Sequence, residues 1–467
     1  MQDQGKAPLL WGNFFKLGMP QIRAFHMSWF AFFLCFFAWF GIAPLMKVVR
    51  DELQLTQSQI GWSIIASVAI TVVARLVIGW LCDHVGPRLA YTWLLILGSI
   101  PVMLIGLAND PWTFIFFRLL IGMIGASFVI TQYHTSVMFA SNVVGTANAT
   151  SAGWGNMGGG ATQLIMPVVF GVLTLGAVIP FTEIEFLGGL GLDPAMGWRV
   201  AMLLAGVTCF LTGLAYFFFT QDCPEGNFKQ LRAKGRLPSK DRNKGAFVEA
   251  CRDPRVWALF IIYGACFGIE LTINNVAALY FADYFDMGLV AAGAIAASFG
   301  LMNLFARTLG GIFGDSFGSR WGLKGRVMWL FMVLFCEGLA LMLFSQMGAL
   351  VLAIPALILF SLFVQMSEGA TFSVVPFVNK RALGAVSGIV GAGGNAGAVA
   401  AGFLFKGAIE WPTALLILGG VVTCCSFFAF AVRFSPAAET EAQKEYALAL
   451  ARKMRADQTP ELQPAQA

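Results

Sequence analysis

The chain has 467 residues, of which 58% are hydrophobic and only 12% are charged, with 44 Phe and 52 Gly. Soluble proteins of this size carry roughly a quarter charged residues, so the composition excludes a soluble globular protein. The net charge of +5 is explained below by membrane topology, and we expect no nucleic-acid partner.

Apolar segments of about 20 residues recur along the chain, which is the length that an α-helix needs to cross a bilayer. The N-terminal segment lacks a compact apolar run with a small-residue cleavage site, so we expect no signal peptide. The predicted fold class is an all-α polytopic membrane protein. Twelve transmembrane helices are expected, at about 25–47, 58–81, 89–108, 112–135, 146–175, 197–219, 255–282, 289–313, 326–346, 349–376, 384–406 and 412–433.

A basic segment at about 220–254 separates two groups of six predicted helices. It predicts an N-terminal half at 1–222, a cytoplasmic central loop at 223–253, a C-terminal half at 254–433 and a cytoplasmic tail at 434–467. With both termini in the cytoplasm, 23 of the 30 Lys and Arg lie inside, as the positive-inside rule requires. The remaining seven are Lys47, Arg50, Arg199 and Lys406 in outer loops, and Arg75, Arg118 and Arg307 within helices.

The most informative pattern in the chain is a spacing that occurs twice. Arg75 and Arg307 lie 232 residues apart in apolar sequence, and each is followed by Gly, Asp, Gly and Arg at four, eight, eleven and thirteen residues. The residues that follow are Gly79, Asp83, Gly86 and Arg88 in the first copy and Gly311, Asp315, Gly318 and Arg320 in the second. A charge at bilayer depth costs about 2.5–3.5 kcal/mol. Because this cost arises twice at equivalent positions, we expect both arginines to be functional, and we interpret them as holding an anion between two halves.

Two further pairs of motifs keep the same order along the chain. Gly125-Ala-Ser-Phe128 is matched 244 residues later by Gly369-Ala-Thr-Phe372. The segment 153–158, Gly-Trp-Gly-Asn-Met-Gly, is matched by the Gly-rich segment 391–397, in which Asn395 lies 239 residues after Asn156. Two parallel six-helix repeats with substrate between them at mid-membrane are typical of a major facilitator transporter.

The segment 79–88 also resembles the signature of that superfamily between its second and third helices, and departs from it at His84. The charged residues of both copies are expected to cap helix ends and to form charge pairs that latch the cytoplasmic side. The predicted gating residues are Asp83, Arg88, Asp315 and Arg320. Positive-inside anchoring alone would explain Arg88, but it would not explain the glycines and Asp83.

Both arginines are expected close to the bilayer midplane. On a helix that rises 1.5 Å per residue, Arg75 lies about 12 Å from Asp83, and Arg307 has the same relation to Asp315. The alternative is that each arginine pairs with a buried carboxylate, and it is weakened because the second and eighth helices supply none. A guanidinium group matches a small planar oxyanion with forked geometry, which favours direct substrate contact.

Buried polar residues elsewhere divide into two groups. Asn156 and Asn395 lie in the Gly-rich helices, and either a bound oxyanion or helix packing explains them. Glu270, Glu337 and Glu368 are carboxylates within predicted helices, where such groups can carry protons. Glu270 is the preferred proton carrier, and Arg118 is expected to pair with one of the carboxylates or to form a structural ion pair.

At this point the chain resembles the nitrate/nitrite porter family of the major facilitator superfamily. The Gly-rich segments at 153–158 and 391–397 resemble its two nitrate signatures, and the segments around Glu270, Arg307 and Glu368 resemble its high-affinity proton-coupled members. The resemblance spans about 25–433 and implies nitrate ligands and a substrate cavity. The implied residues are Arg75, Arg307, Asn156, Asn395, Gly155, Gly394, Tyr263, Phe267, Phe128 and Phe372.

The resemblance further implies how transport is driven. The bacterial antiporters of the family generally lack a carboxylate at the position of Glu270, so its presence favours proton symport, with Glu270, Glu368 and Arg118 as coupling residues. The short central loop indicates a bacterial inner-membrane member. We therefore expect a monomeric proton-coupled importer of nitrate, with nitrite as a further substrate.

Two alternatives remain at the level of sequence: nitrate/nitrite exchange, and a nitrate sensor, for which no signalling domain is evident. We expect no enzyme activity, because no catalytic constellation or cofactor motif is apparent. The nine cysteines and three histidines show no metal-ligand spacing, so neither a cofactor nor a metal is expected.

Overall fold

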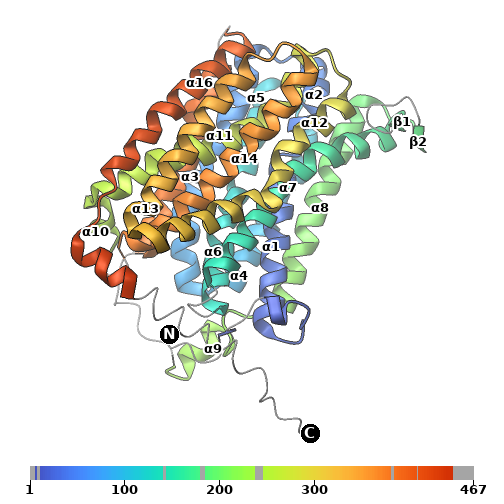
Figure 1. Cartoon of the computed structure of the whole chain (residues 1–467). Coiled ribbons are helices and arrows are strands. Elements are labelled where there is room, and N and C mark those ends of the chain that lie inside the picture. Colours follow the sequence, from blue (N-terminus) through green and yellow to red (C-terminus); the bar gives the residue numbers. More distant parts are fainter. Residues whose placement is uncertain are drawn as a thin grey trace.

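The computed structural model describes residues 6–7, 11–139, 144–178, 185–236, 246–379, 383–406 and 409–444. Within these ranges nearly all regular structure is helical, as predicted (Figure 1). The first half contains α1 (Pro20–Trp39), α2 (Met46–Leu53), α3 (Gln57–Val85), α4 (Pro87–Leu104), α5 (Pro111–Ile121), α6 (Ser127–Met138), α7 (Val144–Leu173) and α8 (Pro194–Phe219). The short helices α9 (Phe228–Ala233) and α10 (Ala246–Arg252) follow. The second half contains α11 (Pro254–Tyr284), α12 (Leu289–Leu301), α13 (Ala306–Ser345), α14 (Leu350–Val374), α15 (Leu383–Gly402) and α16 (Trp411–Ser426).

Eleven stretches in the described ranges are long and apolar enough to cross a membrane. One of them, 289–345, is 57 residues long and contains both the eighth and the ninth predicted helices. Gly322, with φ of 68° and ψ of −156°, breaks the helical geometry within α13 and separates the two. The twelve-helix prediction is therefore confirmed, with one membrane helix assembled from α5 and α6 and another from α12 and the start of α13.

The prediction of helices alone missed one element. A small antiparallel hairpin of β1 (Gly176–Val178) and β2 (Glu185–Gly188) lies between α7 and α8. It projects from the face of the molecule that also carries α2 (Figure 1). We call this the hairpin face, and we call the other end, which carries α9, α10 and the helical segment 436–444, the terminal face.

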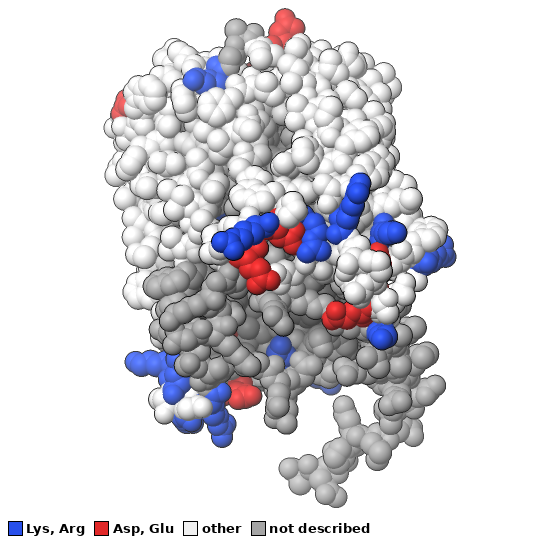
Figure 2. Space-filling model, turned by 90° about the vertical axis from the view of Figure 1, so that its left-hand side faces the viewer, with Lys and Arg blue, Asp and Glu red and all other residues white. Residues whose placement is uncertain are grey.

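The two halves meet along two pairs of helices: α3 packs against α15, and α7 packs against α12. Within the halves, α1 packs on α7 and α11 packs on α15, so the equivalent helices of the two repeats make equivalent contacts. Figure 2 shows a broad surface without charged side chains below the hairpin face, and a dense group of charged side chains nearer the terminal face. Such a distribution is that of a multi-pass membrane protein.

Candidate functional site

Arg75 is held in the interior by the second half of the protein. Its side chain extends from α3 and is only 2% exposed. The Nη1 atom donates to the backbone carbonyl oxygen of Gly391 in α15 at 2.6 Å. The side-chain amide of Asn395 is oriented with its oxygen toward Arg75. This oxygen accepts hydrogen bonds from Nη1 at 2.8 Å and from Nε at 3.3 Å. Nη2 has no hydrogen-bond partner among the described residues, so one donor of the guanidinium is available.

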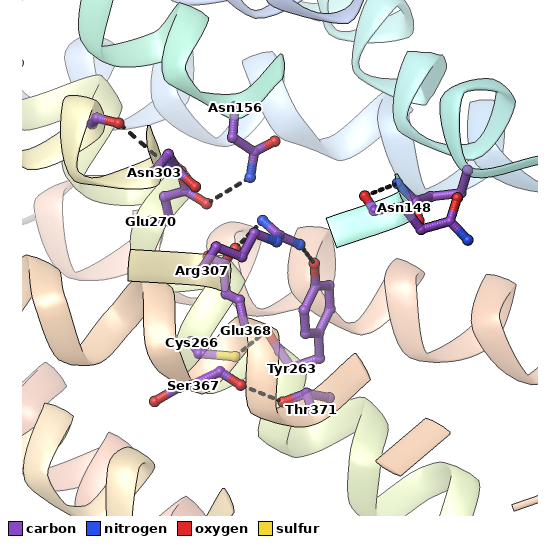
Figure 3. A network of polar contacts seen from close by, with 12 residues as sticks. Asn148, Asn156, Tyr263, Cys266, Glu270, Asn303, Arg307, Ser367, Glu368 and Thr371 are labelled. Carbon is purple, nitrogen blue, oxygen red and sulfur yellow. Dashed lines mark hydrogen bonds and ion pairs between the residues drawn. The ribbon is translucent and has the colours of Figure 1, made fainter. Parts of the chain in front are cut away.

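Arg307 is equally buried but has a different partner. It is 3% exposed, and its Nη1 forms an ion pair with the carboxylate of Glu368, which α14 brings to the site. Its Nη2 donates to the hydroxyl oxygen of Tyr263 at 3.1 Å (Figure 3). The expectation that neither arginine pairs with a carboxylate is therefore wrong for Arg307. That expectation considered only the helix carrying the arginine, whereas the partner comes from a different helix.

Four aromatic side chains enclose the two guanidinium groups. The Cζ atom of Arg75 lies 5.3 Å from the ring centroid of Phe128 and 5.2 Å from that of Phe267, which are cation–π distances. The Cζ atom of Arg307 lies 5.9 Å from the ring of Phe128. Tyr263 stacks on Phe267 at 5.1 Å between ring centroids, and it meets Phe372 edge-on at the same distance. All four aromatic residues implied by the resemblance thus lie at one place, and they leave both arginines almost inaccessible.

Glu270 lies beside this pair and is completely buried. Its two oxygens accept from different amides: Oε1 accepts from Asn303 Nδ2 at 2.7 Å, and Oε2 accepts from Asn156 Nδ2 at 3.2 Å. The amide nitrogen of Asn156 therefore contacts a carboxylate. Glu368 and Glu270 lie on either side of Arg307 (Figure 3). Asn303 and the Gly391 carbonyl were not predicted. An amide four residues before Arg307 in an apolar stretch was the available signal for Asn303.

Gly155 and Gly394 contact aromatic rings. A Cβ atom on Gly155 would lie 1.9 Å from a ring atom of Phe32, and one on Gly394 would lie 2.3 Å from a ring atom of Phe267. These distances are far too short for any real contact. The two glycines therefore let α7 approach α1 and let α15 approach α11.

This packing also aligns the two repeats and shows where they differ. Phe32 and Phe267 take the same place against Gly155 and Gly394, so residue 270 corresponds to residue 35. The motif pair at 125–128 and 369–372 likewise relates residue 368 to residue 124. Cys35 and Ile124 occupy those positions in the first half. Both carboxylates of the site consequently belong to the second half.

Arg118 does not pair with a carboxylate, contrary to expectation. Its Nη2 donates to Asn275 Oδ1 at 2.6 Å and its Nη1 donates to the backbone carbonyl oxygen of Trp39 at 3.2 Å. The side chain is fully buried and joins α5 to α11 across the two halves. Glu337, the third buried glutamate, has no hydrogen-bond donor for either oxygen among the described residues. Neither residue contacts the two central arginines.

The two copies of the loop motif have different structures despite their identical spacing. α3 ends at Val85 and turns at Gly86, which has a φ of 92°. In the second copy α13 continues beyond Gly318 and turns only at Gly322, so the exposed Arg320 lies before the turn whereas Arg88 lies after it. Apolar periodicity did not reveal the additional turn of helix, because the residues between 313 and 322 are mostly polar or small.

The charge pairs near these turns lie within each half. Asp315 pairs at 2.5 Å with Arg326, which follows the turn. Arg88 donates from Nε to the backbone carbonyl oxygen of Phe217 at 2.8 Å and lies over the ring of the same residue. The side chain of Asp83 lies outside the described residues.

On the side of the hairpin face, several contacts connect the halves. Arg50 forms an ion pair with Asp283 at 2.7 Å, and Gln163 donates to the backbone carbonyl oxygen of Asn274 at 2.6 Å. Gln57 donates to the backbone carbonyl oxygen of Phe405 at 3.2 Å. Within the described ranges, the hydrogen bonds that join the halves lie at the arginine site or toward this face. The structure is closed on the hairpin side.

The sequence of the chain is similar to known proteins along most of its length. A family model described as Major Facilitator Superfamily matches residues 28–378. The "High affinity nitrate transporter 2.5" of Arabidopsis thaliana is 41% identical over 414 residues, which cover 88% of this chain and 80% of that protein. The "Nitrate/nitrite transporter NrtP" of Picosynechococcus is 31% identical over 453 residues, which cover 81% of this chain and 83% of that protein.

Among solved structures, a bacterial homologue of the human lysosomal transporter Spinster matches with a TM-score of 0.65. The match covers 88% of this chain and 98% of that one, at 15% sequence identity. The nucleoside transporter NupG matches with a TM-score of 0.62 at 14% identity, covering 88% of this chain and all of the other. At such low identity these two matches describe the fold alone.

Proposed function

The chain belongs to the nitrate/nitrite porter family of the major facilitator superfamily, and on this premise we propose that it imports nitrate or nitrite together with protons. Its relatives are transporters and not enzymes. Nitrate binds between Arg75 and Arg307, and the two halves rock about this site so that it opens to one side of the membrane at a time.

The chemistry of the two arginines supports the choice of anion. A guanidinium group presents planar forked donors that match a planar oxyanion. Arg75 already has a donor without a partner, Nη2, and its other bonds go to neutral acceptors. The rings of Phe128 and Phe267 exclude water from the same space. A small anion of low charge fits such a site better than a strongly hydrated one.

The observation that carries proton coupling is the ion pair between Arg307 and Glu368. While Glu368 is ionised it occupies the donors of Arg307. A proton on Glu368 removes that attraction, so the Arg307 guanidinium becomes available to nitrate. Glu270 contacts two amides, whereas Glu368 contacts Arg307 directly, so we assign the transported proton to Glu368 and not to Glu270.

Charge balance supports the same assignment. Two guanidinium groups and two carboxylates make the empty site neutral overall. Nitrate alone would leave one uncompensated negative charge in a buried environment, which is costly. One proton taken up with each nitrate restores neutrality. The proton and the anion are then both released when the site opens on the other side.

We test this by reconstituting the protein in liposomes that contain no nitrite and imposing a pH gradient. Nitrate should accumulate inside, which excludes obligatory nitrate/nitrite exchange. Glu368→Gln should still bind nitrate and exchange it across the membrane, because no ionised carboxylate then competes for its Arg307. Glu368→Gln should lose accumulation driven by the pH gradient.

The control is Glu337→Gln, which removes another buried carboxyl group and should keep that accumulation. Wild-type accumulation without nitrite that persists in Glu368→Gln would contradict the assignment to Glu368.

We further propose that the terminal face is cytoplasmic and that the protein acts as a monomer in a bacterial inner membrane. The excess of basic residues in the segments predicted to lie inside supports this orientation. Labelling of a cysteine introduced at the exposed Lys234 by a membrane-impermeant reagent should require permeabilised cells. Labelling of intact cells would reverse the orientation.

A further inference from the structure

Two glycine turns on the terminal face are each held by a carboxylate from a distant segment. Gly86, with φ of 92°, connects α3 to α4, and Gly322, with φ of 68°, connects the two membrane helices within α13. Both conformations favour glycine because a side chain is strained there. Each turn also begins a helix, whose first N–H groups have no partner within that helix.

Asp222 supplies the hydrogen-bond acceptor for a free backbone N–H group at the first turn. This side chain follows α8 and is 2% exposed. Its Oδ1 accepts from the backbone N–H of Arg88 at 2.9 Å, and its Oδ2 accepts from the backbone N–H of Phe228 at 2.8 Å. A Cβ atom on Gly86 would lie 2.4 Å from Oδ1 of Asp222, so the contact requires glycine. Burial raises the pKa of Asp222 above its ordinary value, and the two N–H groups oppose that effect. One carboxylate thus connects the start of α4, the end of α8 and the start of α9.

Glu439 supplies the hydrogen-bond acceptors for free backbone N–H groups at the second turn. It lies on the helical segment 436–444, which follows the last membrane helix. Its Oε2 accepts from the backbone N–H of Leu323 at 2.7 Å, and its Oε1 accepts from that of Lys324 at 3.1 Å. A Cβ atom on Gly322 would lie 2.4 Å from Oε2. The two carboxylates take equivalent places in the repeats, although one is Asp, the other is Glu and no shared motif surrounds them.

We propose that Asp222 and Glu439 are positioning residues for the two substrate arginines. Each one fixes the terminal-face end of an arginine-bearing helix to the segment that follows the last helix of its half. Arg75 lies 11 residues before Gly86, about 16 Å along the helix, and Arg307 lies 15 residues before Gly322, about 22 Å. A helix transmits a displacement of its end along this length, and a binding group must be held to within about 0.5 Å. The inference rests on the proposed role of the arginines as nitrate ligands.

The test uses the full chain, purified and shown to be folded, with nitrate as the ligand. Asp222→Asn and Glu439→Gln each remove the charge and one N–H acceptor. Asp193→Asn and Glu410→Gln are matched controls near the hairpin face, where Asp193 caps its own helix and Glu410 is exposed. We expect the nitrate Kd to rise about three- to tenfold in each test variant and to stay within about twofold in the controls. The effects should multiply in the double variant, because the two sites belong to different halves.

A second measurement needs no substrate. Hydrogen–deuterium exchange should accelerate at 86–90 in Asp222→Asn and at 322–326 in Glu439→Gln, because these amides lose their acceptors. Faster exchange with an unchanged Kd in the folded protein would overturn the positioning role and leave a purely structural one. Unchanged exchange would overturn the contacts themselves. If the wild-type protein binds no nitrate while the exchange result holds, the proposed function fails and the carboxylate contacts stand.

Discussion

The two central arginines are chemically unequal even though the sequence around them is repeated. Arg75 donates to a backbone carbonyl and an amide, which are neutral, whereas Arg307 is neutralised by Glu368. The repeated spacing in apolar sequence pointed to both arginines, and the resemblance to the family implied the aromatic residues near them. Their partners were not predictable in the same way, because each partner comes from a helix far away in the chain. Only the packing of α3 on α15 and of α13 on α14 brings these groups together.

At this scale we predict that lysine cannot replace either arginine. An ammonium is a compact charge without a planar fork, so Arg75→Lys cannot contact the Gly391 carbonyl, Asn395 and nitrate together. Loss of a charge-assisted forked contact in a buried site amounts to about 3 kcal/mol, or roughly a hundredfold in affinity. Saturable uptake and equilibrium binding of labelled nitrate measure the effect in Arg75→Lys and Arg307→Lys. The exposed Arg433→Lys is the control, and a Kd within threefold of wild type in either test variant would refute the prediction.

At the scale of elements, glycine-rich helices set how closely the helices of each half approach. The sequence identified α7 and α15 as equivalent and left open whether their glycines pack or bind. Contacts with Phe32 and Phe267 show that Gly155 and Gly394 pack tightly against aromatic rings. Helix number and order followed from hydropathy, since each membrane helix must be long and apolar. The length of α13 could not be predicted from hydropathy, because its last turns before Gly322 are formed mostly by polar or small residues.

Alanine at these glycines should destabilise the protein. A Cβ atom overlaps a ring in both positions, more severely at Gly155 than at Gly394. Overpacking of this kind costs about 1–3 kcal/mol, so Gly155→Ala and Gly394→Ala should melt at lower temperature in detergent, with the larger decrease for Gly155→Ala. Gly388→Ala in α15 meets no atom within 4 Å and should be neutral or stabilising. Equal melting temperatures for all three variants would be inconsistent with the packing described.

At the scale of the whole molecule, the two halves are joined at the centre and toward the hairpin face. Arg50–Asp283, Gln163–Asn274 and Arg118–Asn275 all connect the halves there. The repeat in the sequence predicted two related halves, and the comparisons confirm the corresponding family and fold. It did not predict this state of closure, because closure depends on how two surfaces meet and not on the pattern of either one.

Weakening these contacts should favour opening on the hairpin side. The side chains of Arg50 and Asp283 are about one quarter exposed, so solvent screens their pair and limits it to about 1 kcal/mol. Asp283→Asn should therefore increase the open population by up to about fivefold. A cysteine at Asn274, which lies buried against Gly159 and Gly300 between the halves, reports this opening through its rate of thiol labelling. The native cysteines are replaced beforehand, and Asp110→Asn is the control. An unchanged labelling rate would count against a latch at this pair.

In the proposed mechanism, the carboxylate of Glu368 occupies a donor of Arg307 that nitrate itself would use. On this proposal the empty carrier contains an internal competitor for its own cargo, and the anion displaces it on entry. On exit the same carboxylate returns to Arg307 and helps to expel the anion. A site built in this way sacrifices affinity for a short residence time, which favours rapid turnover over tight storage of the anion.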